Sequence, residues 1–470
     1  MEIARDDYLQ KLDKVRENGL VKIITGVRRC GKSYLLFTLY RSFLRRKGVT
    51  DDHIVSVQLD DDEAVELRDP RKLSAWIKER LPKDGTPTYV FIDEIQMCKP
   101  DEGAPKPILT FYDVLNSLMK KPGVDVYVTG SNSEMLSKDV ATNFRDRGVE
   151  VRVWPLGFDE YLPVSGMEKT EAWDRYLTWG GMPLCVLAHD DRARRTYLNT
   201  LFQRIYLKDI VERYSLTDDG TMLSAVVDIL ASDVGSLTNP QKLADSSQSV
   251  CGVKISGPTV AKYIGHLVDS FLYNRAERWD VKGKRYLSYP SKYYSVDLGL
   301  RNARLNFRQV ELSHLMENAI YNELLRRGYG VDVGVVETVG KDKNGKSIKK
   351  RSEIDFVVNL GQTKVYIQSA FAIPDQAKRE QETYSLRHSG DFFRKIVIEN
   401  GIAMPRTDAD GIVYVGVIPF LLHPEILSRQ VASDCSEIVG FENNPPVTLM
   451  LEPSVSVVLS ASRSKLLAEI

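Results

Sequence analysis

The sequence predicts an α/β protein of several domains, the first of which contains an open parallel sheet. A short apolar, β-branched run at 21–25 leads into a glycine-containing loop and then into a helix with apolar residues at helical spacing. Two more apolar strands, at 89–92 and 124–129, are followed by polar residues. The chain has 470 residues, too many for one core, so roughly two to four domains are expected.

The composition limits the class of protein. Lys plus Arg and Asp plus Glu are each 64, so bulk charge favours neither nucleic acid nor a membrane surface as partner. No apolar run approaches the roughly 20 residues that cross a bilayer, and the charged N-terminal segment is unlike a signal peptide. The five cysteines are scattered, which is typical of reduced thiols. We therefore expect a cytoplasmic protein without a membrane partner.

Residues 26–33 match the pattern G-x-x-x-x-G-K-[ST] in full, between a strand and a helix. In that context the loop N–H groups and the positive end of the helix dipole bind phosphate. Lys32 is expected to reach the β- and γ-phosphates, and the Ser33 hydroxyl to coordinate Mg²⁺. We therefore expect ATP and Mg²⁺ to bind here, with the nucleotide held by Gly26, Val27, Arg28, Arg29, Cys30, Gly31, Lys32, Ser33 and Tyr34.

An acidic pair follows the strand at 89–92. Carboxylates at the carboxyl end of a parallel strand face the ligand crevice of an open α/β sheet. Asp93 is expected to hold Mg²⁺ through water, and Glu94 to polarise the attacking water as a catalytic base. The alternative is a strand end that carries two solvated acids. Next to a phosphate-binding loop, the catalytic interpretation is favoured.

Polar residues also follow the strand at 124–129, in the segment T-G-S-N-S-E-M-L. Ser131 and Asn132 stand where a side chain could sense the γ-phosphate or orient water, and a plain polar turn is the alternative. Residues from about 155 to 218 are expected to be mainly helical. Lys208 and Arg213, which lie on these helices, could approach the nucleotide, although a solvated helix face also accounts for them.

Several ordered motifs together resemble a large prokaryotic AAA+ family, namely V-K-I-I-T-G-V-R-R-C-G-K-S, V-F-I-D-E-I-Q, V-Y-V-T-G-S-N-S-E-M-L and Y-L-T-W-G-G-M-P. Its members pair a P-loop ATPase with a C-terminal domain of unknown function. The resemblance implies a sensor asparagine, matched by Asn132. It also implies an arginine finger in F-R-D-R-G, with Arg147 as the catalytic candidate and Arg145 as the alternative; surface ion pairs are the other interpretation. A finger acts between subunits, so a homo-oligomer is a candidate assembly.

The changes in residue pattern give four regions. We assign 1–160 to an AAA+-like P-loop ATPase domain, 161–218 to a helical lid, 219–300 to a winged-helix-like domain and 301–470 to a nuclease-like α/β domain. In the third region, three helices precede a basic hairpin, which is the order of a winged helix. In a complex with DNA, the major groove would receive Thr259, Lys262 and His266. The DNA phosphates would be contacted by Lys282, Lys284 and Arg285. Contact with a protein or with another domain is the alternative.

The last region resembles the PD-(D/E)xK nuclease-like fold. Glu317 on a helix and Asp355 on a hairpin strand fit the first two acidic positions of that constellation, which holds Mg²⁺. At the third, Gln368 stands where an acid belongs and Ala370 where a lysine belongs. We therefore expect the scaffold without its usual catalytic set, and cleavage would need a displaced residue such as Lys378 or Gln381.

The tip of that hairpin, residues 341–351, carries six basic residues and one acidic residue. This charge predicts either a solvated loop or a patch that contacts phosphates. Three functions follow as hypotheses: an ATP-driven switch or motor associated with nucleic acid, a nucleotide-gated module that binds a protein and carries a catalytically dead nuclease-like domain, and an ATP-dependent nuclease. The candidate partners are ATP, DNA and an unidentified protein.

Overall fold

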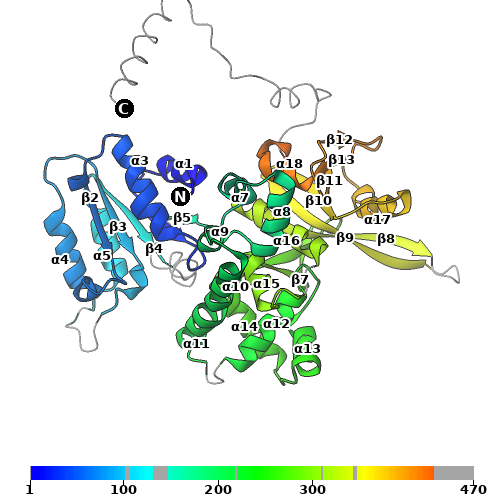
Figure 1. Cartoon of the computed structure of the whole chain (residues 1–470), viewed down its shortest axis with the longest axis horizontal. Helices are drawn as coiled ribbons and strands as arrows, with labels where there is room; N and C mark the ends of the chain where they lie inside the picture. The colour runs from blue at the N-terminus through cyan, green and yellow to red at the C-terminus, as the bar shows by residue number, and fades with distance from the viewer. Residues whose placement is uncertain are drawn as a thin grey trace, which may run out of the picture. The chain divides into compact units, whose positions relative to one another are not determined.

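The computed structural model describes residues 2–100, 106, 108–130, 147–216, 220–308, 311–341 and 347–427 (Figure 1). The chain divides into a unit of residues 1–422 and a second unit of residues 423–470. In the second unit, the described part contains one short 3₁₀ helix, η7 (Pro424–Leu427). Among the described helices, none is long and apolar enough to cross a membrane.

The N-terminal part of the first unit contains a five-stranded sheet whose strand pairs are all parallel, in the order β2-β3-β4-β1-β5. Every residue of β1 and β3 is buried, as expected for strands covered on both faces. The predicted parallel α/β sheet is confirmed. Its strands are β1 (Val21–Thr25), β2 (Ile54–Gln58), β3 (Thr88–Asp93), β4 (Val124–Thr129) and β5 (Gly148–Arg152).

Helices cover both faces of this sheet. Ile23, Val90 and Val128 pack with Leu73 of α4 and Leu118 of α5, whereas alternate strand residues pack with the helices that flank the glycine loop. The loop is followed by one continuous helix of three segments, the middle one π-helical. The elements are α1 (Asp6–Lys14), α2 (Lys32–Tyr34), η1 (Leu35–Tyr40), α3 (Arg41–Arg46), η2 (Asp51–His53), η3 (Val65–Arg68), α4 (Pro70–Arg80), η4 (Ile95–Met97) and α5 (Phe111–Met119).

The helices expected in the middle of the chain form, and they share a core with the helix that follows the glycine loop. The first group corresponds to the predicted lid and the second to the three helices predicted before the basic hairpin. They are α7 (Phe158–Ser165), α8 (Lys169–Trp179), α9 (Pro183–Val186), α10 (Asp191–Thr200), η6 (Leu201–Leu207) and α11 (Lys208–Arg213), then α12 (Thr221–Ser232), α13 (Pro240–Cys251) and α14 (Gly257–Asp269).

The remaining strands form one eight-stranded sheet of order β12-β13-β11-β10-β9-β8-β6-β7. Helices α16 and α17 pack on its strands. The elements are β6 (Tyr273–Asp280), β7 (Arg285–Ser295), α15 (Leu298–Arg304), α16 (Leu312–Arg326), β8 (Gly330–Lys341), β9 (Ser347–Leu360), β10 (Thr363–Ala370), α17 (Gln376–Arg387), β11 (Arg394–Glu399), β12 (Arg406–Thr407), β13 (Val413–Gly416) and α18 (Val417–Leu422).

The hairpin predicted as the wing forms as β6 and β7, but it is the edge of this larger sheet. β6 pairs in parallel with β8, with Arg278 opposite Val333. The sheet therefore crosses the predicted boundary at residue 300. This pairing buries alternate residues of β6 against the core, which a free wing would leave in solvent. The winged-helix assignment stays a prediction.

Candidate nucleotide-binding site

The loop from Gly26 to Ser33 has a backbone that depends on glycine at two positions. At Gly26, a Cβ atom would lie 2.1 Å from the carbonyl oxygen of Val153. Gly31 has φ +100° and directly precedes α2, a conformation that L-residues rarely adopt. The motif thus folds as its sequence predicts, with a tight turn followed at once by the first turn of a helix.

Lys32 lies across this loop. Its ammonium group donates to the carbonyl oxygens of Gly26, at 3.0 Å, and Val27, at 3.2 Å, and the side chain is buried. These two bonds hold the positive charge over the loop and leave one of its three N–H donors for another acceptor. The Ser33 side chain, half-exposed, lines the same cavity.

The acidic pair at the end of β3 is held by the neighbouring strand. Asp93 is buried, and one of its oxygens accepts the hydroxyl hydrogen of Thr129, the last residue of β4. The same hydroxyl oxygen accepts the N–H of Glu94 at 3.1 Å. Glu94 has φ +49°, a strained conformation for a residue with a side chain, and such conformations gather at functional sites. Gln96 donates its amide to the Glu94 carboxylate.

Thr129 is the site residue that sequence reasoning missed. Its position was available as a signal, because it ends a strand that neighbours β3. A hydroxyl there can bond to both groups at the carboxyl end of β3. The pattern of single residues does not reveal this, since the contact depends on which strands are adjacent.

A cavity of about 880 Å³ opens above the loop, within the range of sizes that hold small-molecule ligands. Glu94, Lys99 and residues of the helices after β5 line it. An ion pair between Arg28 and Asp209 closes the loop against α11, and the Tyr206 hydroxyl donates to the Arg28 carbonyl oxygen at 2.7 Å. The remaining lining residues include Arg29, Gly31, Lys32, Ser33, Tyr34, Pro183, Leu184, Leu187, Glu212 and Arg213.

The predicted site residues do not all meet here. Arg213 lines the cavity, as expected, whereas Lys208 is exposed and pairs with Glu212 at 3.6 Å. Arg147 precedes β5, at the opposite end of the sheet from the loop, where its guanidinium lies 3.5 Å from Asn116 Oδ1. Within one chain it does not reach the cavity, so its finger role stays a prediction about an assembly. Ser131, Asn132 and Arg145 lie outside the described residues.

The residues predicted to contact DNA are only partly accessible. Lys262, Lys282, Lys284 and Arg285 are exposed. His266 is buried and its ring stacks on Tyr214 with centroids 3.5 Å apart. The expectation that this histidine enters a groove is therefore corrected: its position on α14 turns it toward the helical core.

The basic hairpin arm projects from the eight-stranded sheet as the ends of β8 and β9 (Figure 1). Its tip, residues 342–346, lies outside the described residues. Arg351 and Lys349 both pair with Glu337, at 2.8 and 3.5 Å, and the Lys350 ammonium lies 4.7 Å from the centre of the Tyr384 ring. All three basic side chains remain exposed, so these weak contacts leave the arm able to meet phosphates.

In the nuclease-like region, a lysine occupies the middle of the carboxylate cluster. The Lys292 ammonium, from β7, lies 2.8 Å from Glu317, 2.7 Å from Glu353 and 3.4 Å from Asp355. Lys292 is buried, Tyr294 donates to Glu317 at 2.7 Å, and the N–H of Ser369 donates to Asp355 at 2.9 Å. The structure thus brings Glu317 and Asp355 together as predicted, around a cation supplied by the chain.

Burial and the neighbouring charges shift the pKa of Lys292 and of Asp355. Burial alone would lower the pKa of Lys292, but Glu317, Asp355 and Glu353 outweigh it and hold that pKa well above its ordinary value. Burial, together with the charge of Glu317, raises the pKa of Asp355 to about 8. The carboxylates therefore keep Lys292 charged, while burial opposes the ionisation of Asp355.

Gln368 and Ala370 are not part of this cluster. Gln368 donates to Glu382 of α17 at 3.3 Å, and Ala370 packs in a core with Leu386 of the same helix. Lys378, offered as a replacement residue, pairs with Glu382 at 2.6 Å. In the part of the chain that the structure describes, no group of three or more His, Cys, Asp or Glu side chains is arranged to hold a metal ion. The expectation of a nuclease-like scaffold without its usual catalytic set stays a prediction.

Comparisons with known proteins identify the first region. Residues 18–162 match the model of an AAA domain, and residues 170–311 match a domain of unknown function (DUF8612). An uncharacterized protein of Haemophilus influenzae is 33% identical over 89% of this chain and 98% of its own length. An uncharacterized protein of Methanocaldococcus jannaschii is 26% identical over 77% of this chain and 78% of its own.

Solved structures resemble the chain only loosely. The Aeropyrum pernix ORC1 protein in complex with DNA is 13% identical, covers 65% of this chain and 93% of its own, and superposes with a TM-score of 0.27. The Hsp104–ADP complex of S. cerevisiae is 13% identical, covers 70% of this chain and 43% of its own, and also gives a TM-score of 0.27.

Proposed function

This chain belongs to the same family as the Haemophilus influenzae protein and carries an AAA domain, and on that premise we propose that it binds and hydrolyses ATP. The observation that carries the proposal is the cavity that Lys32 and Glu94 both line, with the buried Asp93–Thr129 pair bonded to the backbone of Glu94. A structural role alone would not require a strained glutamate at the end of β3.

The residues at the cavity fit a nucleoside triphosphate with its magnesium ion. Gly26 and Gly31 give the loop N–H groups close access to phosphate, and Lys32 would exchange its two carbonyl partners for phosphate oxygens. Ser33 and Asp93 provide oxygen ligands of the type that Mg²⁺ prefers. When bound, Mg²⁺ would neutralise the charge that develops on the phosphates.

In hydrolysis, Glu94 would accept the proton of the attacking water. Its carboxylate lines the cavity, while its N–H is fixed by Thr129. Gln96, which holds the Glu94 carboxylate, would keep it turned toward the cavity. Thr129 would therefore serve as a positioning residue, because it bonds to both acids of the pair and does not itself line the cavity.

The experiment compares the full chain with Lys32→Ala, using MgATP binding by calorimetry and phosphate release. Wild type should bind and turn over ATP, and Lys32→Ala should weaken both, because the loop loses the positive charge that faces the phosphates. A matched control is Lys47→Ala, an exposed residue after α3 that pairs with Asp13. Equal affinity and turnover in wild type and Lys32→Ala would refute the proposal.

We further propose that ATP drives a switch or motor associated with nucleic acid. The proposal is supported by two exposed basic side chains, Lys262 and Lys284, and by the basic arm at 347–351. DNA should then stimulate turnover, and the stimulation should fade as salt rises, because phosphate contacts release counterions. Reversing the charge of the arm with Lys349→Glu and Lys350→Glu should remove the stimulation of turnover by DNA. Turnover indifferent to DNA at low salt would exclude this role.

A second candidate is a nucleotide-gated module that binds a protein. The observation that favours it over an ATP-dependent nuclease is Lys292, whose ammonium fills the space among the three carboxylates. With that cation in place, we expect no cleavage of DNA in Mg²⁺ or Mn²⁺. A cytoplasmic location and a homo-oligomer remain part of the proposal, and light scattering with and without MgATP tests the assembly.

A further inference from the structure

Arg5, just before α1, ties the phosphate-binding loop to two other segments. Its guanidinium donates to the carbonyl oxygen of Cys30 at 3.3 Å and to that of Trp154 at 2.9 Å. It also pairs with Glu160 of α7 at 2.8 Å. Arg5 is buried and lines the nucleotide cavity, so one cation lies at the junction of the loop, the segment after β5 and α7.

The bond to Cys30 bears on the loop's ability to bind phosphate. The Cys30 carbonyl and the Gly31 N–H belong to one peptide unit, which is planar and trans. Fixing the direction of the carbonyl therefore fixes the direction of that N–H. A guanidinium on the carbonyl also polarises the peptide unit, which makes its N–H a stronger donor. Arg5 thus orients one of the donors on which the proposed nucleotide site depends.

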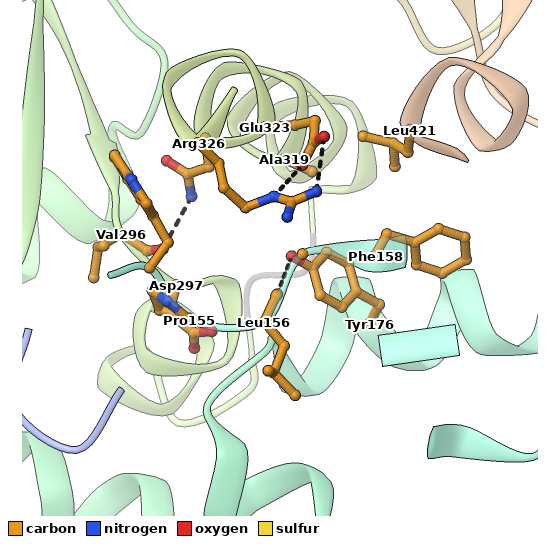
Figure 2. A pocket seen from close by; sticks show the side chains of 13 residues that line it. Pro155, Leu156, Phe158, Tyr176, Val296, Asp297, Ala319, Glu323, Arg326 and Leu421 are labelled. Atoms are coloured by element: carbon orange, nitrogen blue, oxygen red, sulfur yellow. Dashed lines mark hydrogen bonds and ion pairs between the residues drawn. The ribbon is translucent and has the colours of Figure 1, made fainter. Parts of the chain in front are cut away.

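Glu160 extends the contact toward α16. Its second oxygen accepts the N–H of Gly157 at 3.0 Å and lies 3.8 Å from the guanidinium of Arg326. Arg326 also donates to Asp159 at 2.7 Å and to Glu323 at 2.8 Å. Figure 2 shows Arg326 and Glu323 bonded to each other on α16, beside the segment that carries Leu156 and Phe158.

The network ends at α18. Glu323 also accepts a bond from Arg327 at 2.5 Å. Arg327 in turn donates to the carbonyl oxygens of Phe420 and Leu421 at 2.9 and 3.0 Å. An unbroken series of ionic hydrogen bonds and ion pairs therefore runs from the phosphate-binding loop to the helix that follows β13.

Because these side chains are buried, the loss of any one of them affects its partners in the series. The side chains of Arg5, Glu160, Glu323, Arg326 and Arg327 are each between 4% and 9% exposed. Water therefore screens their charges poorly, and a buried ion that loses its partner is strongly destabilised. A displacement of Arg5 would therefore alter the position of Glu160 and, through Glu160, that of Arg326.

We infer that nucleotide binding at the loop is coupled to the packing of α16 and α18 through Arg5, Glu160 and Arg326. The inference rests on the proposed nucleotide binding and adds a regulatory connection to it. It assigns Arg5 as a positioning residue of the loop. Because coupling is reciprocal, a change at Arg326 alters the affinity for nucleotide although Arg326 does not line the nucleotide cavity.

The test measures the dissociation constant of MgADP for the full chain by calorimetry. Arg326→Gln should weaken binding about 5-fold or more, the lower end of coupling between sites. Arg5→Gln should weaken it further, and the double variant should be no weaker than Arg5→Gln alone, because both changes break one series. Arg326→Lys should recover part of the affinity. The control Arg175→Gln breaks an exposed pair with Asp191 and should change nothing.

Hydrogen exchange in wild type and Arg5→Gln tests the coupling even where Arg326→Gln does not fold. MgADP at saturation should slow exchange in 312–326 and 417–422 of wild type, and the effect should be absent in Arg5→Gln. Equal affinity in wild type and Arg326→Gln, or equal exchange changes in wild type and Arg5→Gln, would overturn the coupling alone. Absence of MgADP binding by wild type would instead remove the proposed function and the coupling together.

Discussion

The Thr129 hydroxyl donates its hydrogen to the Asp93 carboxylate and, through the same oxygen, accepts the N–H of Glu94. One side chain of β4 therefore fixes both acids at the end of β3, one by its carboxylate and the other by its backbone. This relationship explains how Glu94 keeps a positive φ, because the bond to its N–H holds that conformation in place.

Removing that hydroxyl should impair turnover more than nucleotide affinity. In Thr129→Val the shape is kept, but Asp93 loses a buried donor and the N–H of Glu94 loses its acceptor. We expect kcat for ATP to fall about 10-fold or more, since positioning of the base is lost. Thr129→Ser keeps the hydroxyl and should stay within a few-fold of wild type. A normal kcat in Thr129→Val would show that this bond does not position the pair.

Lys292 should matter for stability through charge. Lys292→Met leaves Glu317, Glu353 and Asp355 together without a cation, and breaking a buried ion pair typically costs about 3–5 kcal/mol. Denaturant unfolding should show this fall, and Lys292→Met with Glu317→Gln should recover part of it, because one of the mutually repelling charges is removed. Unchanged unfolding in Lys292→Met would mean that the ammonium is not what holds the carboxylates.

Asp297 should make stability depend on pH. Its carboxylate, labelled in Figure 2, accepts the N–H groups of Gly181 at 2.7 Å and Leu300 at 2.9 Å. Burial raises the pKa of Asp297 to about 6. An unfolded aspartate titrates near pH 4, so the folded chain binds this proton more tightly. The contribution of this tighter proton binding to the free energy of unfolding is complete below about pH 4 and is lost as pH rises through 6.

The measurement compares wild type with Asp297→Asn, which cannot lose a proton. The free energy of unfolding of wild type, relative to the variant, should fall by about 3 kcal/mol at most between pH 4 and pH 7, because each tenfold gain in proton affinity on folding is worth about 1.4 kcal/mol. Taking the difference cancels the other titrating groups. A difference that stays flat over this range, or that grows with pH, would contradict the assignment.

The sequence was sufficient where local structure depends on residues that are neighbours in the chain. The loop at 26–33, the acidic pair after β3 and the parallel sheet all follow from short patterns of apolar, glycine and charged residues. Such patterns determine local backbone geometry, so they can be interpreted without knowing what packs against them.

It was insufficient where contacts join distant segments. The pairing of β6 with β8 depends on which strand edges meet, and residues 273–295 alone are equally suited to a free hairpin. Lys292 meets Glu317, Glu353 and Asp355, which are 25, 61 and 63 positions further along the chain. Arg5 meets Glu160, which is 155 positions further along the chain. A charged residue in the sequence does not indicate which distant residue it will pair with.

The most direct test of ATP hydrolysis at this site is steady-state turnover by wild type and Glu94→Gln, purified in parallel, with MgATP affinity measured for both. The substitution keeps the size of the side chain and removes its ability to accept a proton. Hydrolysis at this site predicts unchanged MgATP affinity and a turnover lower by about 10²-fold or more, the loss expected for a general base. Equal turnover by the two proteins would contradict it and would place hydrolysis, if any is seen, at another group.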